Sequence, residues 1–140
     1  MTTRTLYFFT SCLSFSLGFF LYLTIETLYK RHISHSNTHW SMGLLAGLAF
    51  LFLLFLDKTS LLFWQKAALG MVFITAGELL FGLYLNLYRG LDIWDYSHLP
   101  LHLFGQICPS FSLLWLVFSC AVLWINRFLL WEIKFLLDIN

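Results

Sequence analysis

Charged residues are scarce in this sequence, and their scarcity indicates the class of protein. Lys, Arg, Asp and Glu make up 11% of its 140 residues, while 60% of the residues are hydrophobic. A soluble domain usually carries about 25% charged residues, so this chain could not cover its surface with polar side chains in water. We therefore expect the lipid bilayer to surround it. The formal net charge of +1 gives no reason to expect a nucleic-acid partner.

Several motifs that define common enzymes and channels are also absent. The three cysteines, Cys12, Cys108 and Cys120, form no C-x-x-C pair, so we predict no disulfide framework. Without a G-x-x-x-x-G-K-S/T loop, the chain does not hydrolyse nucleotides by that route. It contains neither G-x-S-x-G nor H-E-x-x-H, and no run of gating arginines or selectivity-filter motif. We predict no cofactor and no metal site, and these absences favour a protein that is not an enzyme.

Long apolar runs dominate the sequence instead. Crossing about 30 Å of hydrocarbon takes about 20 helical residues, and each span must be helical because lipid offers backbone groups no hydrogen bonds. We predict an all-α fold: one transmembrane domain over residues 1–140, built as a four-helix bundle. Its predicted spans are residues 6–28, 40–56, 62–87 and 109–130, followed by an interfacial segment at 128–140. The first run lacks a small-x-small cleavage site, so we expect it to be retained.

The distribution of basic residues favours one orientation in the cell membrane. The predicted topology places five basic residues with the termini and the second connection, and three on the opposite side. The first group is Arg4, Lys58, Lys66, Arg127 and Lys134, and the second is Lys30, Arg31 and Arg89. The positive-inside rule then predicts a multi-pass protein with both termini in the cytoplasm.

An acidic residue inside the third run is the most informative single feature. Glu78 lies about eleven residues into that run, hence near the middle of the bilayer. An ionised carboxylate there is costly unless it faces protein or finds a partner. Polar and small residues recur around it every three or four positions, which places them on one helix face: Thr75, Glu78, Gly82, Asn86 and Arg89. We predict that Glu78, Asn86 and Arg89 line a substrate or ion path, although such a face could also serve only to pack helices.

Other residues extend this interpretation to the first and second runs. Glu26 lies near the membrane edge, where Lys30 one turn later could pair with it, and we assign Glu26 to the same path. Gly43 and Gly47 form a G-x-x-x-G pair that lets helix backbones approach closely, and we assign Gly82 a similar packing role.

The connection between the third and fourth runs contains more aromatic and leucine residues than a plain loop. Trp94 and Tyr96 suit the headgroup region, and long structured connections tend to be functional. We predict an ordered cap over the bundle mouth in which Trp94, Asp95 and Tyr96 contact the path. The alternative is a segment that merely lies in the interface.

The histidines in the first connection do not make a convincing metal site. His32, His35 and His39 are three and four residues apart, which would align them on a helix. The residues between them are typical of a loop, and no nearby cysteine or acid completes a ligand set.

The residues around the acid and the cap resemble those of a known family. They are similar to the bacterial ABC-transporter type IV (CmpB-like) membrane proteins, a family related to small four-span vertebrate proteins of unassigned function. The matching stretches are Thr75-Ala76-Gly77-Glu78-Leu79-Leu80-Phe81-Gly82, Trp94-Asp95-Tyr96-Ser97, Gly105-Gln106-Ile107-Cys108 and Ser112-Leu113-Leu114-Trp115, with a looser match at Gly18 and Glu26-Thr27-Leu28-Tyr29. The resemblance implies a permease-type protein that depends on a separate ATPase or other membrane subunit.

Three functions remain open from the sequence. The leading hypothesis is a membrane protein that binds or passes a small solute or ion through a polar interior. The second is an accessory or regulatory subunit without transport activity, and the third is an intramembrane enzyme that acts on a lipid through Asp95, His98 and Glu78. Four helices form a thin pore wall, which favours a homo-oligomer. The similar ends of the first and third runs, Glu26 to Lys30 and Glu78 to Arg89, suggest two hairpin repeats.

Overall fold

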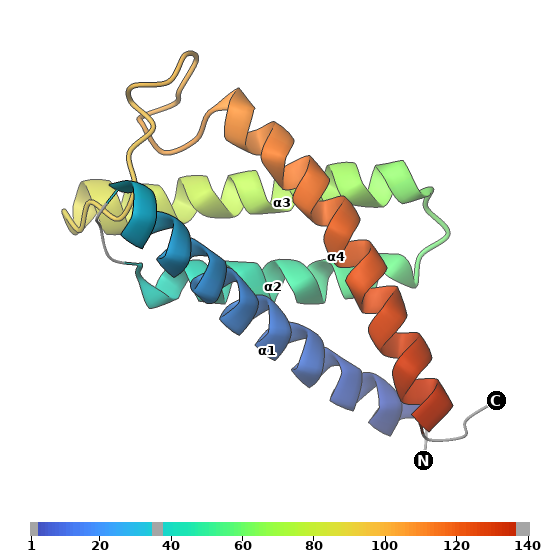
Figure 1. The fold of residues 1–140 in the computed structure, drawn as a ribbon. Coiled ribbons are helices and arrows are strands. Elements are labelled where there is room, and N and C mark those ends of the chain that lie inside the picture. The colour runs from blue at the N-terminus through green and yellow to red at the C-terminus, as the bar shows by residue number, and fades with distance from the viewer. Residues whose placement is uncertain (1–2, 35–37, 137–140) are drawn as a thin grey trace.

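The computed structural model describes residues 3–34 and 38–136, and it consists of four long helices and one structured connection (Figure 1). Two of the helices continue for one turn as wider π-helical segments. The elements are α1 (Thr3–Tyr29) with η1 (Lys30–Ser34), α2 (Trp40–Asp57), α3 (Phe63–Gly82) with η2 (Leu83–Tyr88), and α4 (Pro109–Leu136). All four helices are long and apolar enough to cross a membrane, so the predicted all-α, four-helix membrane fold is confirmed.

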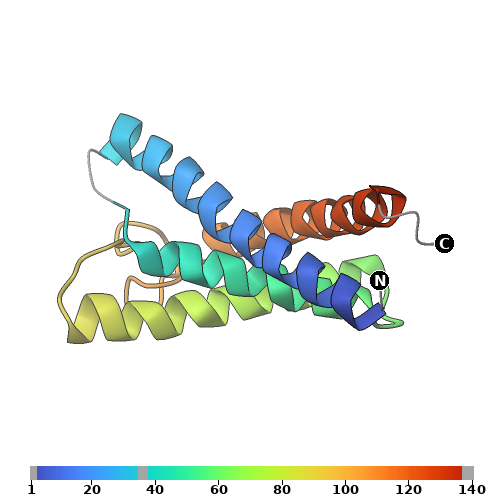
Figure 2. The same ribbon diagram turned by 90° about the horizontal axis from the view of Figure 1, so that it is seen from below.

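The helices differ in how much of their surface they bury. Helices α2 and α3 run antiparallel side by side, while α1 and α4 cross them obliquely and diverge towards the end that carries residues 89–108 (Figures 1 and 2). Helix α2 is buried over most of its length. Its Phe50 and Leu53 pack in a core with Val122 and Leu123 of α4. The outer faces of the other helices expose large apolar side chains such as Phe20, as expected for surfaces that meet lipid.

Glycines let α1 approach α2 closely. A Cβ on Gly43 would lie 2.6 Å from Leu23, and one on Gly47 would lie 2.7 Å from Phe15, so each position receives a side chain of α1. In the opposite direction, the Phe50 ring of α2 lies 2.6 Å from the place where a Cβ on Gly18 of α1 would be. The G-x-x-x-G pair thus contacts α1, whereas the nearest neighbour of Gly82 is the cap residue Gln106.

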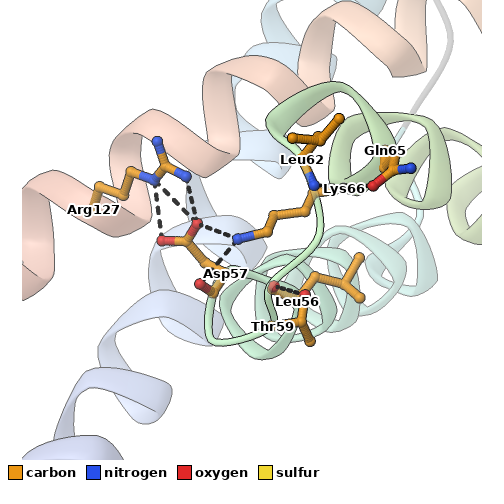
Figure 3. A network of polar contacts seen from close by, with 7 residues as sticks. All are labelled: Leu56, Asp57, Thr59, Leu62, Gln65, Lys66 and Arg127. Atoms are coloured by element: carbon orange, nitrogen blue, oxygen red, sulfur yellow. Dashed lines mark hydrogen bonds and ion pairs between the residues drawn. The ribbon is translucent and has the colours of Figure 1, made fainter.

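A cluster of ion pairs joins three helices at the α2–α3 turn (Figure 3). The Asp57 carboxylate accepts hydrogen bonds from Nη2 of Arg127 at 2.7 Å and from Nζ of Lys66 at 3.3 Å. The Lys66 amine also donates to the main-chain oxygen of Asp57. The end of α2, the start of α3 and the C-terminal half of α4 are therefore held together at the end of the molecule opposite the cap.

The observed helix ends extend beyond the predicted spans. The first helix continues through η1 beyond the predicted residue 28, and α4 runs to Leu136 where the predicted span ends at residue 130. The third helix with η2 covers residues 63–88, close to the predicted 62–87. Residues 128–136 of the predicted interfacial segment are thus part of α4, and residues 137–140 lie outside the described residues.

Candidate functional site: a buried acid beside a capped cavity

The Glu78 carboxylate is enclosed by the protein. The residue is 1% exposed, and each of its oxygens accepts a hydrogen bond. The Tyr96 hydroxyl donates to Oε1 at 3.1 Å, and the Trp115 indole nitrogen donates to Oε2 at 2.7 Å. A void of about 10 Å³ lies beside Glu78, at the lower limit for one water molecule. The acid therefore depends on protein donors.

The two donors come from different elements and also form the wall of a larger cavity. Tyr96 belongs to the cap and stacks on Phe111 of α4 with ring centroids 4.3 Å apart. Trp115 lies one turn further along α4 and packs near Tyr22 of α1. Tyr96 and Trp115 both line a cavity of about 380 Å³ between α1, α4 and the cap, so they separate this cavity from Glu78.

The π-helical segments hold the cap in place. Asn86 of η2 accepts a hydrogen bond from the Ile93 amide at 2.8 Å and donates to the Trp94 oxygen at 2.9 Å and to Gln106 at 2.7 Å. Lys30 of η1 donates to the Ile93 oxygen at 2.9 Å. π-Helical turns are rare and often occur at functional sites. Here they bring a side chain from each of two helices to the same cap residue.

The cap itself has a compact, strained backbone. The Tyr96 amide donates to the Gly105 oxygen at 2.8 Å, and the Trp94 indole donates to the Gln106 oxygen at 3.0 Å. Gly105 has a φ of +68°, and a Cβ there would lie 2.7 Å from Asp95, so only glycine fits. Three other cap residues adopt positive φ without being glycine: Asp92, Leu101 and Phe104. Such strain is maintained only where the surrounding contacts enforce it.

The polar end of the cavity contains an ion pair with an unsatisfied oxygen. Glu26 Oε1 lies 3.0 Å from Nζ of Lys30, as the four-residue spacing suggested. Glu26 Oε2 is buried and finds no hydrogen-bond donor among residues 3–34 and 38–136. The other acidic and histidine side chains that line the cavity come from the cap: Asp92, Asp95 and His98.

The other residues assigned to the path occupy different surroundings. Arg89 is exposed, so the polar face of the third helix turns outward after Asn86. Asp95 is also exposed, and Ser97 holds its carboxylate through the side-chain hydroxyl at 2.7 Å and the amide at 2.8 Å. These hydrogen bonds lower the pKa of Asp95.

Burial, followed by the nearby Glu78 charge, raises the pKa of the Tyr96 hydroxyl, which favours its role as a neutral donor.

The structure adds two residues to which the sequence assigned no site role. Gln106 is 3% exposed and connects Asn86 to the cap, and Trp115 supplies the shorter hydrogen bond to Glu78. The family resemblance includes both residues in its matching stretches, but nothing in those stretches identified the partner of Trp115. His35 lies outside the described residues, so the three-histidine grouping is not described. In residues 3–34 and 38–136 no cluster of His, Cys, Asp or Glu is arranged to hold a metal ion.

The four apolar helices define a multi-pass membrane protein, and it encloses an acid, Glu78, beneath a structured connection. The model of the family described as "Putative ABC-transporter type IV" matches residues 6–137. The chain belongs to this family. No curated protein and no solved structure matches it significantly.

Proposed function

We propose that the chain binds a small solute or ion in the capped cavity and passes it through the polar interior by way of Glu78. The observation that carries this proposal is the shared wall. Tyr96 and Trp115 bind the carboxylate on one side and line the cavity on the other. Rotation of either ring would join the two compartments, so the pair would act as a gate in front of a mid-membrane acid.

Family membership and charge support a proposal for the setting of this activity. We infer a location in the cell membrane with both termini in the cytoplasm, because basic residues are more numerous at that end. A separate ATPase or another membrane subunit would supply energy, since the chain has no phosphate loop of its own. A homo-oligomer would add further helices to the thin wall of the path. By the resemblance of the sequence, the small four-span vertebrate proteins would be distant relatives of this chain.

Substitution of the buried acid tests the proposal. Membrane vesicles from cells that express the chain would be assayed for uptake of radiolabelled rubidium and tetramethylammonium. We expect Glu78→Gln to abolish the uptake that the wild-type chain adds, with insertion and expression unchanged, because glutamine retains the size of the side chain and removes its charge. Glu132→Gln, at the far end of α4, is the matched control. Wild-type uptake by Glu78→Leu would disprove a role for the acid.

The closed interior gives some support to the alternative of an accessory subunit. Beyond Glu78 the bundle is tightly packed, and Ser14 donates to Asn126, whose amide donates to the Phe50 main-chain oxygen at 3.1 Å. Such bonds hold helices together without forming a path. Co-purification separates the two functions, because a partner that loses its fold or location without this chain would favour the accessory role.

The lipid-enzyme alternative has less support. Asp95 and His98 line the cavity, whereas Glu78 lies behind Tyr96 and Trp115. An acid–base mechanism that uses all three would first require the gate to open. Lipid turnover by the purified chain that is lost in Asp95→Asn would support this activity.

A further inference from the structure

A second cavity extends the capped one along the membrane-facing side of the molecule. It has a volume of about 360 Å³ and lies between α1 and α4, where the two helices diverge (Figures 1 and 2). It shares Tyr22, Glu26, Tyr29, Phe111 and Trp115 with the capped cavity. The two cavities therefore adjoin along these side chains and are the two halves of one candidate space. Each part alone is within the range of about 300–1,000 Å³ that is typical of small-molecule sites.

The two halves of this space have opposite chemistry. Apart from Glu26 and two tyrosines, the half between the helices is lined by apolar side chains: Ile25, Phe111, Leu114, Trp115, Val117, Phe118 and Ala121. Ile25 and Val117 are 55% and 66% exposed, so this half opens sideways towards the acyl chains. The capped half contains all the other charged groups that line the space. It also lies at the ends of α1 and α3, where headgroups begin.

The charge in the capped half favours a cation. Three carboxylates line it, those of Glu26, Asp92 and Asp95, against the single ammonium of Lys30, with His98 beside them. The Lys30 amine already binds Glu26 Oε1 and the Ile93 oxygen. Glu26 Oε2 has no donor in residues 3–34 and 38–136 although it is buried, and such an oxygen is costly to leave unsatisfied.

Aromatic rings complete the recognition of a cation. The capped half is lined by Tyr22, Tyr29, Trp94, Tyr96, Phe111 and Trp115. The faces of such rings attract cations, and cages of aromatic side chains bind quaternary ammonium groups. Carboxylates beside aromatic rings suit an amine or ammonium group better than a hydrated metal ion.

We infer that the ligand of this site is an amphiphile with an amine or ammonium head. The head would lie in the capped half beside Glu26, and an apolar chain would lie between α1 and α4 after entering sideways from the bilayer. This inference rests on the proposed function and specifies its substrate class. Two sources share this chemistry: a membrane lipid with an ammonium headgroup and a soluble amphiphile that partitions into the bilayer.

Binding to the full chain in lipid nanodiscs tests both halves. The probe is radiolabelled dodecyltrimethylammonium. Tetramethylammonium represents its ammonium head without the apolar chain, and dodecyl maltoside represents its apolar chain with a neutral head. We expect Glu26→Gln to weaken probe binding about tenfold or more, since it removes the charge but retains the shape. Glu132→Gln should bind as the wild type does. Equal binding by Glu26→Gln and wild type would overturn the assignment of the head.

A second pair of variants tests the half of the space between α1 and α4, where the apolar chain of the ligand would lie. Ala121→Phe should fill the space between α1 and α4 and weaken binding of dodecyltrimethylammonium, while binding of tetramethylammonium stays unchanged. Ala68→Phe, on the exposed face of α3, is the matched control and should change neither. If tetramethylammonium binds as tightly as the probe and Ala121→Phe has no effect, the ligand has no chain and the inference fails. That result would leave the Glu78 uptake test, and with it the proposed function, intact.

Nanodisc composition distinguishes the two sources. If the natural ligand is a lipid, discs of phosphatidylcholine should compete with the probe, and discs of phosphatidylglycerol should not. Mass spectrometry of the purified chain should then also detect a retained lipid with an ammonium headgroup. Equal probe binding in both discs supports a soluble amphiphile. If dodecyl maltoside displaces the probe as strongly as unlabelled dodecyltrimethylammonium does, the site does not require a cationic head and the inference fails.

Discussion

At the scale of single residues, the arrangement around Glu78 explains how an apolar helix can carry a buried acid. A carboxylate in this position requires donors that do not come from water. The protein supplies one donor for each oxygen, Tyr96 from the cap and Trp115 from α4. The same two rings pack on Phe111 and Tyr22, so apolar contacts orient the donors.

Removal of the indole donor should destabilise the protein measurably. Trp115→Phe keeps an aromatic ring in place but leaves Glu78 Oε2 without a hydrogen bond, which should cost about 1–3 kcal/mol. Thermal unfolding in detergent would report the loss. Trp124→Phe is the matched control, since Trp124 is 65% exposed and its substitution should leave the midpoint nearly unchanged. Equal midpoints for the two variants would contradict the role given to Trp115.

The inward direction of the Glu78 side chain could be predicted from the sequence, but its hydrogen-bond donors could not. Residues at helical spacing, from Thr75 to Asn86, share a face, and that pattern already turns the acid inward. Tyr96 and Trp115 are 18 and 37 residues away in sequence. Their positions depend on how the cap folds back over the bundle, which no periodic pattern encodes. Arg89 was assigned to the same face, but the widened η2 turn changes the helical phase, and its side chain is exposed.

At the scale of elements, the cap is the part that local rules describe least well. Its path requires positive φ at five described positions: Gly90, Asp92, Leu101, Phe104 and Gly105. The sequence indicated an ordered connection through its aromatic content, but not which residues would anchor it. The anchors lie in π-helical turns, and their hydrogen-bonding pattern has no recognisable sequence signature. The four helices, in contrast, follow directly from hydropathy and length.

A pair of glycine variants separates backbone strain from steric overlap in the cap. Gly90 and Gly105 both have positive φ, but a Cβ at Gly90 would meet nothing within 4 Å, whereas one at Gly105 would meet Asp95. Gly90→Ala should therefore cost only the strain of the left-handed conformation, about 1–2 kcal/mol. Gly105→Ala should also displace the Asp95–Ser97 turn.

Limited proteolysis reports on these changes. We expect chymotrypsin to cleave residues 91–104 faster in Gly105→Ala than in Gly90→Ala, and both faster than in wild type. If Gly90→Ala is cleaved as fast as Gly105→Ala, the close approach of Asp95 to Gly105 does not determine the order of the cap.

At the scale of the whole molecule, the two ends of the bundle are built differently. One end is fixed by the Asp57 cluster, which joins α2, α3 and α4 (Figure 3). At the other end α1 and α4 diverge around the cavities, and the cap covers the opening (Figure 1). Movement of α1 relative to α4 would thus change the capped end most.

The Asp57 cluster should contribute strongly to stability through one of its two ion pairs. Lys66 is 4% exposed, so Asp57→Asn leaves a buried ammonium without its counter-charge, at a cost of about 3–5 kcal/mol. Arg127→Gln should cost less than about 1 kcal/mol, because the Arg127 side chain is 41% exposed. Denaturant unfolding in micelles measures both values. A smaller loss for Asp57→Asn than for Arg127→Gln would show that the buried pair is not the main contributor.

The anchoring of the cap has an evolutionary consequence. Many of its fixed points are main-chain atoms: the amide and oxygen of Ile93, the oxygens of Trp94 and Gly105, and the amide of Tyr96. The side chains of Trp94, Tyr96 and Gln106 add further hydrogen bonds. The side chains at the tip, such as Leu101 at 84% exposure, take little part in this framework. Mutations at the tip can therefore accumulate without dismantling the lid. Like the hypervariable loops of an antibody on their rigid sandwich, this segment could acquire new selectivity while the scaffold beneath it stays the same.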